Sequence, residues 1–199
     1  MQSSWSKTGL SSNAYDAKFA ALERSGQDVH GEANFVASLR VSSILDAGCG
    51  TGRVAIELSQ RGFEVVGVDR DADLLHTARA KAPHLPWYLE DLATVELTIS
   101  GAPGQRRLFD AIIMAGNVMI FLDPESEGAV VNNMARHLAP GGVLVAGFQL
   151  HPGGFGLDQY DSLATRAGLE LATRWATWGR QAWYHSSNYA VSVHRRQPA

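Results

Sequence analysis

Cysteine is almost absent from this chain, which has one, Cys49, among 199 residues. A lone thiol cannot form an intramolecular disulfide, and it supplies neither a zinc framework nor the disulfide scaffold of a small secreted domain. We therefore expect no metal site and a cytoplasmic location.

Long hydrophobic runs are lacking too. The longest mostly apolar stretch, residues 111–122, is interrupted by Asn117 and is shorter than the roughly 18 residues that a membrane-spanning helix needs. Residues 1–16 are polar and lack the apolar core of a signal peptide. We therefore expect no membrane association and no export.

The chain has no large excess of either charge, since its formal net charge is −3. Residues 171–199 nevertheless hold four arginines, no acidic residue, and Trp175, Trp178 and Trp183. Arginines interleaved with aromatic residues can form a nucleic-acid groove. The period-two alternation of residues 169–175 and 189–194 instead favours two strands with charged outer faces, so we expect no nucleic-acid partner.

From residue 41 onward, strand and helix signals alternate. This order is typical of an α/β fold in which helices cover both faces of a parallel sheet, and the length favours a single domain. Strands are predicted at 41–47, 63–68, 85–89, 108–115, 143–149 and in the two alternating segments near the end. Asp123-Pro124 predicts a helix that begins at the proline, and Pro140-Gly141-Gly142 predicts its sharp end.

The first forty residues precede this pattern. Tyr15, Phe19 and Leu22 share one helical face, and Phe35, Val36 and Leu39 share another. We interpret residues 1–40 as a helical lid over a functional domain at 41–199.

The most informative segment runs from Ile44 to Arg53, where a hydrophobic strand leads through Asp46 and the glycines 48, 50 and 52 into a helix. Such glycines let the backbone approach a ligand, and the helix start offers unpaired N–H groups. Asp69 follows the next strand, where an acid accepts hydrogen bonds from ribose hydroxyls. A dinucleotide fingerprint would need glycine at Arg53, so a nicotinamide cofactor is disfavoured.

The Gly-x-Gly-x-Gly turn preceded by Asp46 resembles motif I of the class I S-adenosylmethionine-dependent methyltransferases, small-molecule branch. Residues 65–69, 90–92, 109–117 and 138–145 resemble the later motifs in the same order, so the resemblance spans about residues 41–195. It implies a single Rossmann-like αβα domain with a mostly parallel seven-stranded sheet whose last strand is antiparallel. It also implies S-adenosylmethionine as cofactor and S-adenosylhomocysteine as product.

The resemblance assigns roles to residues of the matching motifs. Asp69 would hold the ribose, Asp91 would accept the adenine amino group, and Arg70 and Leu92 would lie on either side of the adenine. The glycine turn would contact the methionine end, braced by Asp46, and Ala115 to Asn117 would line the side of the sulfonium. The implied cofactor residues are Asp46, Gly48, Cys49, Gly50, Gly52, Asp69, Arg70, Leu74, Asp91, Leu92, Ala115, Gly116 and Asn117.

The methyl acceptor is expected at the carboxyl ends of the strands, where ligands of this fold enter. Tyr15, His151, Trp178, Arg180 and Tyr184 are the candidate acceptor-binding residues. The catalytic residue is left open, with His30, His151 and His185 as candidate bases.

The hypothesis is a methyltransferase acting on a small molecule by direct displacement, as a monomer or homodimer. The fourth motif reads Ala-Gly-Asn-Val where amino-methylating DNA enzymes resemble Asp/Asn-Pro-Pro-Tyr, which argues against DNA bases. A noncatalytic S-adenosylmethionine-binding module and a nicotinamide-dependent oxidoreductase are the alternatives.

Overall fold

The structure, a computed structural model, describes residues 12–102 and 104–198, without the side chains of Ser12, Asn13 and Tyr15. Its strands are β1 (Ser43–Ala47), β2 (Glu64–Asp69), β3 (Trp87–Leu89), β4 (Phe109–Met114), β5 (Leu138–Gln149), β6 (Leu169–Trp175) and β7 (Tyr189–Arg196). Its helices are α1 (Ser12–Arg24), α2 (Gly31–Ala37), α3 (Arg53–Gln60), α4 (Ala72–Lys81), α5 (Val118–Phe121), α6 (Glu127–Arg136) and α7 (Leu157–Arg166).

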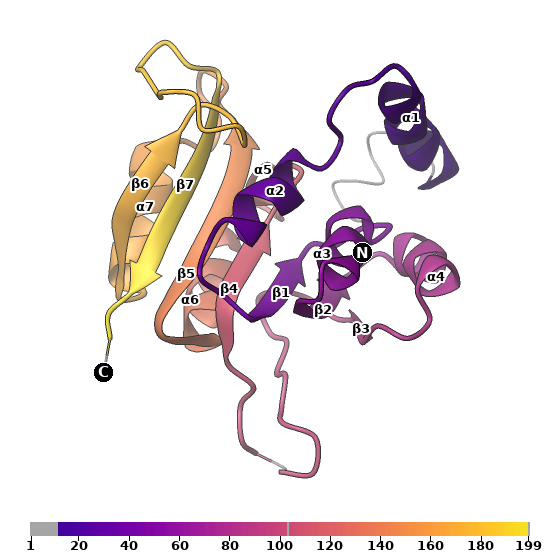
Figure 1. The fold of residues 1–199 in the computed structure, drawn as a ribbon. Helices are drawn as coiled ribbons and strands as arrows, with labels where there is room; N and C mark the ends of the chain where they lie inside the picture. Colours follow the sequence, from indigo (N-terminus) through magenta and orange to yellow (C-terminus); the bar gives the residue numbers. More distant parts are fainter. Residues whose placement is uncertain (1–11, 103, 199) are drawn as a thin grey trace.

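These strands form one sheet in the order β3-β2-β1-β4-β5-β7-β6 (Figure 1). The pairs β1–β2, β1–β4, β2–β3 and β4–β5 are parallel, whereas β7 runs antiparallel to both of its neighbours. The predicted α/β class and the antiparallel last strand are therefore confirmed.

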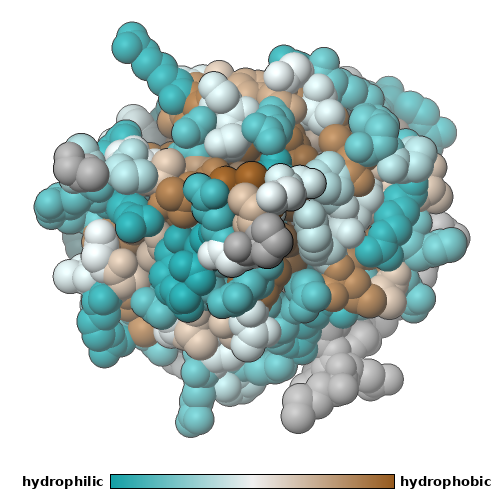
Figure 2. All heavy atoms as spheres, turned by 90° about the horizontal axis from the view of Figure 1, so that it is seen from below, coloured by the Kyte–Doolittle hydropathy of each residue, from teal (hydrophilic) through white to brown (hydrophobic). Residues whose placement is uncertain are grey.

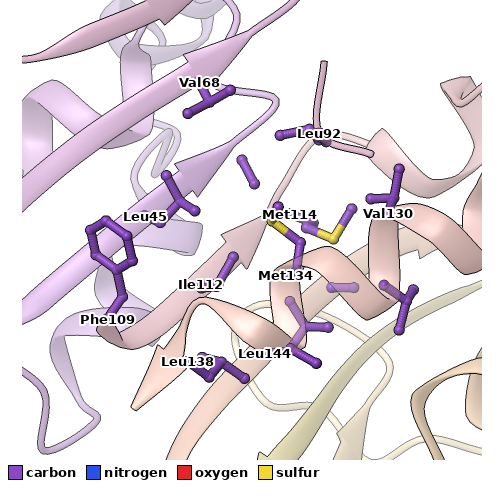
Figure 3. Packing of buried hydrophobic residues seen from close by; sticks show 14 of the residues in the cluster. Leu45, Val68, Leu92, Phe109, Ile112, Met114, Val130, Met134, Leu138 and Leu144 are labelled. Atoms are coloured by element: carbon purple, nitrogen blue, oxygen red, sulfur yellow. The ribbon is translucent and has the colours of Figure 1, made fainter. Parts of the chain in front are cut away.

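Alternate strand residues feed two separate hydrophobic cores. Leu45, Ile112 and Leu144 face α6 and α7, where they meet Val130 and Met134 (Figure 3). Their chain neighbours Ile44, Ile113 and Val145 face the core that contains the buried residues of α2, α3 and α4. Because both faces are covered, the central strands read as nearly continuous hydrophobic runs.

The fifth strand is longer than expected. It starts at Leu138, which pairs with Phe109 before the register shifts between Phe109 and Ala111. A Cβ at Gly142 would lie 2.9 Å from the Ala139 carbonyl oxygen. The predicted helix-ending glycine therefore lies inside the strand, at an irregular step that leaves no room for a side chain.

The helix expected to begin at Pro124 begins at Glu127 instead. Residues 123–126 form a turn in which the backbone N–H and the hydroxyl of Ser126 both donate to the Asp123 carbonyl, at 3.0 and 2.7 Å. The Asp123 side chain is thus not a helix cap and points to other partners.

The two N-terminal helices differ in how they pack. In α2, Phe35 and Val36 are 3% and 0% exposed and belong to the core around α3. In α1 none of the described side chains is buried. Removing all of residues 1–40 would therefore remove part of the core, and α1 alone has the peripheral position expected of a lid. The domain boundary at residue 40 stays a prediction.

Seen from below, hydrophilic residues cover most of the visible surface, with hydrophobic residues scattered among them (Figure 2). Of the helices in the described residues, none is both long enough and apolar enough to cross a membrane.

Trp87 on β3 fixes the geometry beneath the glycine turn. Its indole N–H donates to the Ala82 carbonyl at 2.8 Å, and its ring lies over Gly67 of β2. A Cβ at Gly67 would lie 2.3 Å from that ring, and a Cβ at Gly52 would lie 2.7 Å from it. Both glycines are required because the ring occupies the space of a side chain.

We predict that Gly67→Ala lowers the free energy of unfolding by about 1–3 kcal/mol, because the new methyl group forces the buried indole to move. Urea unfolding followed by fluorescence measures this change. Gly156→Ala is the matched control, since a Cβ there meets nothing within 4 Å and its φ is −114°. Equal stability of the two variants would contradict the tight contact.

Candidate functional site

A cavity lies at the carboxyl ends of β1, β2 and β4, and it contains about 1040 Å³ of empty space including its open mouth. Most of the implied cofactor residues line it, although they come from four separate motifs. Those on its wall are Asp46, Gly48, Cys49, Gly50, Asp69, Arg70, Leu74, Asp91, Leu92, Ala115 and Gly116.

The glycine turn is held by the end of β2. The amides of Gly48 and Cys49 donate to the Val68 carbonyl at 2.8 and 3.1 Å, and the Gly50 amide donates to the Asp69 carboxylate at 2.7 Å. Gly48 has a φ of +82°, and a Cβ on it would lie 2.5 Å from the Val118 side chain. The backbone at Gly48 and Gly50 therefore reaches the cavity without a side chain, and Cys49 and Thr51 of the same turn also line it.

Asp69 is suited to hold a diol. One carboxylate oxygen accepts from Gly50 and the other accepts from the Asp71 amide at 2.9 Å, so each oxygen keeps a further lone pair. Burial raises the pKa of Asp69, against the lowering effect of these amides. A carboxylate held by two amides at the wall of a cavity fits the paired hydroxyls of a ribose.

The wall of the cavity also carries Asp91 and Arg70. One Asp91 oxygen accepts from the Ala93 amide at 2.8 Å. The Arg70 guanidinium forms a two-point ion pair with Asp123 at 2.7 and 3.1 Å, and it lies 3.8 Å from Asp91. The Asp91 carboxylate fits an adenine amino group, so the polar groups on the cavity wall fit both the ribose and the adenine of S-adenosylmethionine.

Two of the implied cofactor residues do not line the cavity. Gly52 is the N-cap of α3 with a φ of +81°, and the Trp87 ring fills the place of its side chain. The Asn117 side chain accepts from the Gln149 amide at 2.8 Å and so joins the end of β4 to the end of β5. Both residues support the walls of the cavity.

Asp46 is buried beneath the glycine turn, where its carboxylate accepts from the Ala55 amide at 3.1 Å. Burial raises the pKa of Asp46 to about 7, against the lowering effect of Arg53 and of that amide. Burial also raises the pKa of the neighbouring Cys49 thiol, which opposes a role for it as nucleophile.

Arg53 was not predicted as a site residue, yet it connects the cavity to the N-terminal segment. Its guanidinium binds Glu32 through two nitrogens at 2.6 and 3.1 Å, donates to the Val29 carbonyl, and lies 4.2 Å from the centre of the Phe19 ring. A cation in the first turn of a helix is disfavoured by the helix dipole. That unfavourable position was the available signal that Arg53 has partners outside α3.

A second tie joins α1 to the glycine turn. The Thr51 hydroxyl donates to Asp16 at 2.6 Å, and the Lys81 ammonium binds the other oxygen of Asp16 at 2.9 Å. Thr51 lines the cavity and is buried. The helix α1 is thus fixed beside the cavity by polar contacts rather than by core burial.

The structure brings Trp178 and Arg180 to the same Phe35 ring, but it does not bring the candidate acceptor residues together at one cavity. Trp178 lies against Gly147 and Phe35, and it lines a second cavity with residues of α1 and α2. Arg180 lies 4.8 Å from the Phe35 ring and donates to Ser38. Tyr184 is 66% exposed, His151 is exposed, and the side chain of Tyr15 is outside the described residues.

The candidate histidines also lie apart. His30 precedes α2 and contacts Glu57 at 3.4 Å and Glu23 at 3.8 Å. His185 stacks beside Trp183 at 5.2 Å between ring centres. Neither these two nor His151 line the cofactor cavity.

The sequence analysis missed four residues that do line the cofactor cavity, because they follow the fourth motif in a segment without a distinctive pattern. They are Val118, Phe121, Leu122 and Ser126.

We predict that Asp46 makes the ligand-free protein less stable as the pH rises from about 4 to 7. The unfolded chain loses the Asp46 proton near pH 4 while the folded protein keeps it to about pH 7, which can cost up to roughly 4 kcal/mol. Urea unfolding across this range should show a smaller decline for Asp46→Asn. Identical pH dependence in both proteins would place the proton elsewhere.

Comparisons with known proteins agree with the family that the motifs resemble. The family described as "Methyltransferase domain" matches residues 44–142. The chain is 31% identical over 127 residues to the dTDP-3-amino-3,4,6-trideoxy-alpha-D-glucopyranose N,N-dimethyltransferase of Streptomyces venezuelae, a match that covers 60% of this chain and 50% of that protein. It is 33% identical over 117 residues to rat glycine N-methyltransferase, covering 51% of this chain and 38% of that enzyme. The matches thus span half or less of these two relatives.

Solved structures match over nearly the whole chain. A TehB-like SAM-dependent methyltransferase from Corynebacterium glutamicum is 31% identical, with a TM-score of 0.82 over 94% of this chain and 98% of that one. A SAM-bound amino pentose methyltransferase from Micromonospora echinaspora shares the fold at 22% identity and a TM-score of 0.69, covering 89% and 95% of the two chains. The motifs, the strand order and these similarities together establish that the chain belongs to the class I S-adenosylmethionine-dependent methyltransferases.

Proposed function

We propose that this protein transfers a methyl group from S-adenosylmethionine to a small-molecule acceptor. The observation that carries the proposal is the cavity in which the bare glycine turn, the Asp69 carboxylate and the Asp91 carboxylate face one space. When bound, the cofactor supplies a methyl group on a positively charged sulfur atom.

The residues of the chain bind the cofactor and orient it. Asp69 accepts hydrogen bonds from the ribose hydroxyls, Asp91 accepts the adenine amino group, and the turn from Gly48 to Gly50 receives the methionine end. Alignment of this kind can contribute roughly 7–11 kcal/mol to a reaction between two bound partners. The absence of a catalytic pair among the residues that line the cavity is therefore compatible with activity.

The acceptor site is proposed at the second cavity, which lies between α1, α2 and the turn at residues 177–179. Its wall includes Phe19, Leu22 and Trp178 together with the carboxylates of Asp28 and Glu32. Glu32 also binds Arg53 of the cofactor cavity at 2.6 Å, so the two cavities adjoin at this ion pair. Aromatic side chains beside the Asp28 carboxylate, with Glu32 already paired to Arg53 and no lysine or arginine among the lining residues, favour an amine or another hydrogen-bond donor over an anion.

The relatives are compatible with an amine acceptor. Among them are N-methyltransferases of an amino sugar nucleotide and of glycine, although a trans-aconitate methyltransferase also matches, at 33% identity. The cytoplasmic location expected from the single cysteine, and the monomeric or dimeric state, stay predictions.

We predict that Asp69→Ala weakens binding of S-adenosylhomocysteine at least about tenfold. A charge-assisted hydrogen-bonded contact to two hydroxyls contributes about 1.5–3 kcal/mol. Isothermal titration calorimetry measures the affinity, with Asp73→Ala as the control because that carboxylate lies four residues further on, in the first turn of α4, and does not line the cavity.

Unchanged affinity in Asp69→Ala would refute the placement of the ribose. Tighter binding of NAD than of S-adenosylhomocysteine by the parent protein would favour the oxidoreductase alternative. Binding without any methyl transfer to a metabolite extract, followed with a labelled methyl donor, would favour the noncatalytic module.

We predict that Leu22→Trp blocks the acceptor cavity without affecting the cofactor cavity. Leu22 lines the second cavity only, so a larger side chain there should reduce methyl transfer to extract amines at least about tenfold while S-adenosylhomocysteine binds as before. Tyr184→Ala serves as the control, since Tyr184 is exposed and lines neither cavity. Loss of transfer in the control alone would move the acceptor site to the turn around Tyr184.

A further inference from the structure

The Arg70 guanidinium lies between two carboxylates that come from different parts of the chain. Its Nη1 is 2.7 Å from Asp123 and 3.8 Å from Asp91, and its Nη2 is 3.1 Å from the second oxygen of Asp123. Two-point pairing is the stronger and more directional arrangement. Arg70 is therefore committed to Asp123, and Asp91 is the next partner within reach.

One oxygen of the Asp91 carboxylate is already hydrogen-bonded, and the other is the oxygen nearest Arg70. The Asp91 Oδ1 accepts from the Ala93 amide at 2.8 Å, which fixes the side chain, and its Oδ2 is the oxygen 3.8 Å from Arg70. Any approach of Arg70 to Asp91 would occupy this second oxygen. A ligand donor and Arg70 therefore compete for the same acceptor.

Asp123 is held in place by its own turn. Both the backbone and the hydroxyl of Ser126 bind the Asp123 carbonyl, and Glu125 supports the turn with a φ of +72°. Leu122 and Ser126 on either side of it line the cofactor cavity. The carboxylate thus approaches Arg70 from a segment that is ordered against the cavity itself.

We infer that Asp123 is a positioning residue for adenine recognition, because it holds Arg70 away from Asp91 and so leaves the Asp91 carboxylate open to the adenine amino group. The inference rests on the proposed function, which places adenine at this end of the cavity. Without Asp123, Arg70 moves onto Asp91, neutralises it and blocks its second oxygen. Arg70 can then donate to a carbonyl at the same position of the purine, which the free carboxylate would repel.

The test compares two probes, S-adenosylhomocysteine and S-inosylhomocysteine, which differ by an amino group against a carbonyl on the purine. Isothermal titration calorimetry gives the ratio of their dissociation constants for each variant. The parent protein should prefer the adenine probe, and Asp123→Ala should reduce this preference about tenfold, as expected for the loss of one charge-assisted hydrogen bond. Asp123→Asn, which keeps the size of the side chain, should act in the same direction.

The double variant Arg70→Met/Asp123→Ala separates positioning from a general structural role. With no arginine to block Asp91, the preference for adenine should return to near the parent value, even if both probes bind more weakly. Glu125→Gln is the control, since it removes a carboxylate from the same turn and leaves the ion pair between Arg70 and Asp123 in place.

Three outcomes would overturn the inference. One is parent-like preference in both Asp123 variants, and another is equal weakening of both probes that the double variant fails to change. A parent protein that binds neither probe would overturn the proposed function itself, and the inference with it.

Discussion

The hydrogen bond from the Gly50 amide to the Asp69 carboxylate determines how the site is built. Because β1 and β2 are parallel neighbours in register, the turn after β1 emerges beside the residue that ends β2. The turn directs the Gly50 amide to that carboxylate and the Gly48 and Cys49 amides to the Val68 carbonyl, and its three glycines supply the positive φ angles that this path uses. The start of α3, the open floor of the cavity and the orientation of Asp69 all depend on this contact. A ligand at this point meets the backbone of the glycines and the Asp69 carboxylate.

The N-terminal segment depends on the same turn through Arg53. The residue directly follows Gly52, so its guanidinium leaves the helix start toward α1 and α2, where Glu32, Val29 and Phe19 surround it. The hydrogen bond from Thr51 to Asp16 adds a contact to α1 one residue before the glycine turn ends. These contacts connect the glycine turn to both helices. The lid stays a prediction, and these are the contacts through which it would respond to an occupied cofactor cavity.

Local patterns predicted what depends on neighbours in the sequence. The glycine spacing and the strand that ends at Asp69 led to the cofactor residues, most of which the structure brings to one cavity. The same reasoning took Asp123 for a helix cap, because Asp-Pro favours a helix start, whereas its partner Arg70 lies 53 positions earlier in the chain. Gly52 and Asn117 were predicted from the motifs to bind the cofactor. Their contacts with Trp87 and Gln149 instead make them supports of the cavity wall. The three candidate histidines were chosen without a motif that fixes their position. None of them lines the cofactor cavity.

Charge balance explains why two arginines line a cavity meant for a cation. Each is matched by a carboxylate from outside the cavity wall, Arg53 by Glu32 and Arg70 by Asp123. The carboxylates that remain on the wall are Asp69, Asp71 and Asp91, above the buried Asp46, which keeps its proton to about pH 7 in the ligand-free protein. Because little water screens charges at a partly enclosed wall, these acids interact strongly with a bound cation. Such a wall attracts a positively charged sulfur more strongly than the neutral thioether that remains after methyl transfer. We therefore expect the acids proposed to hold the methyl donor to favour release of the product as well.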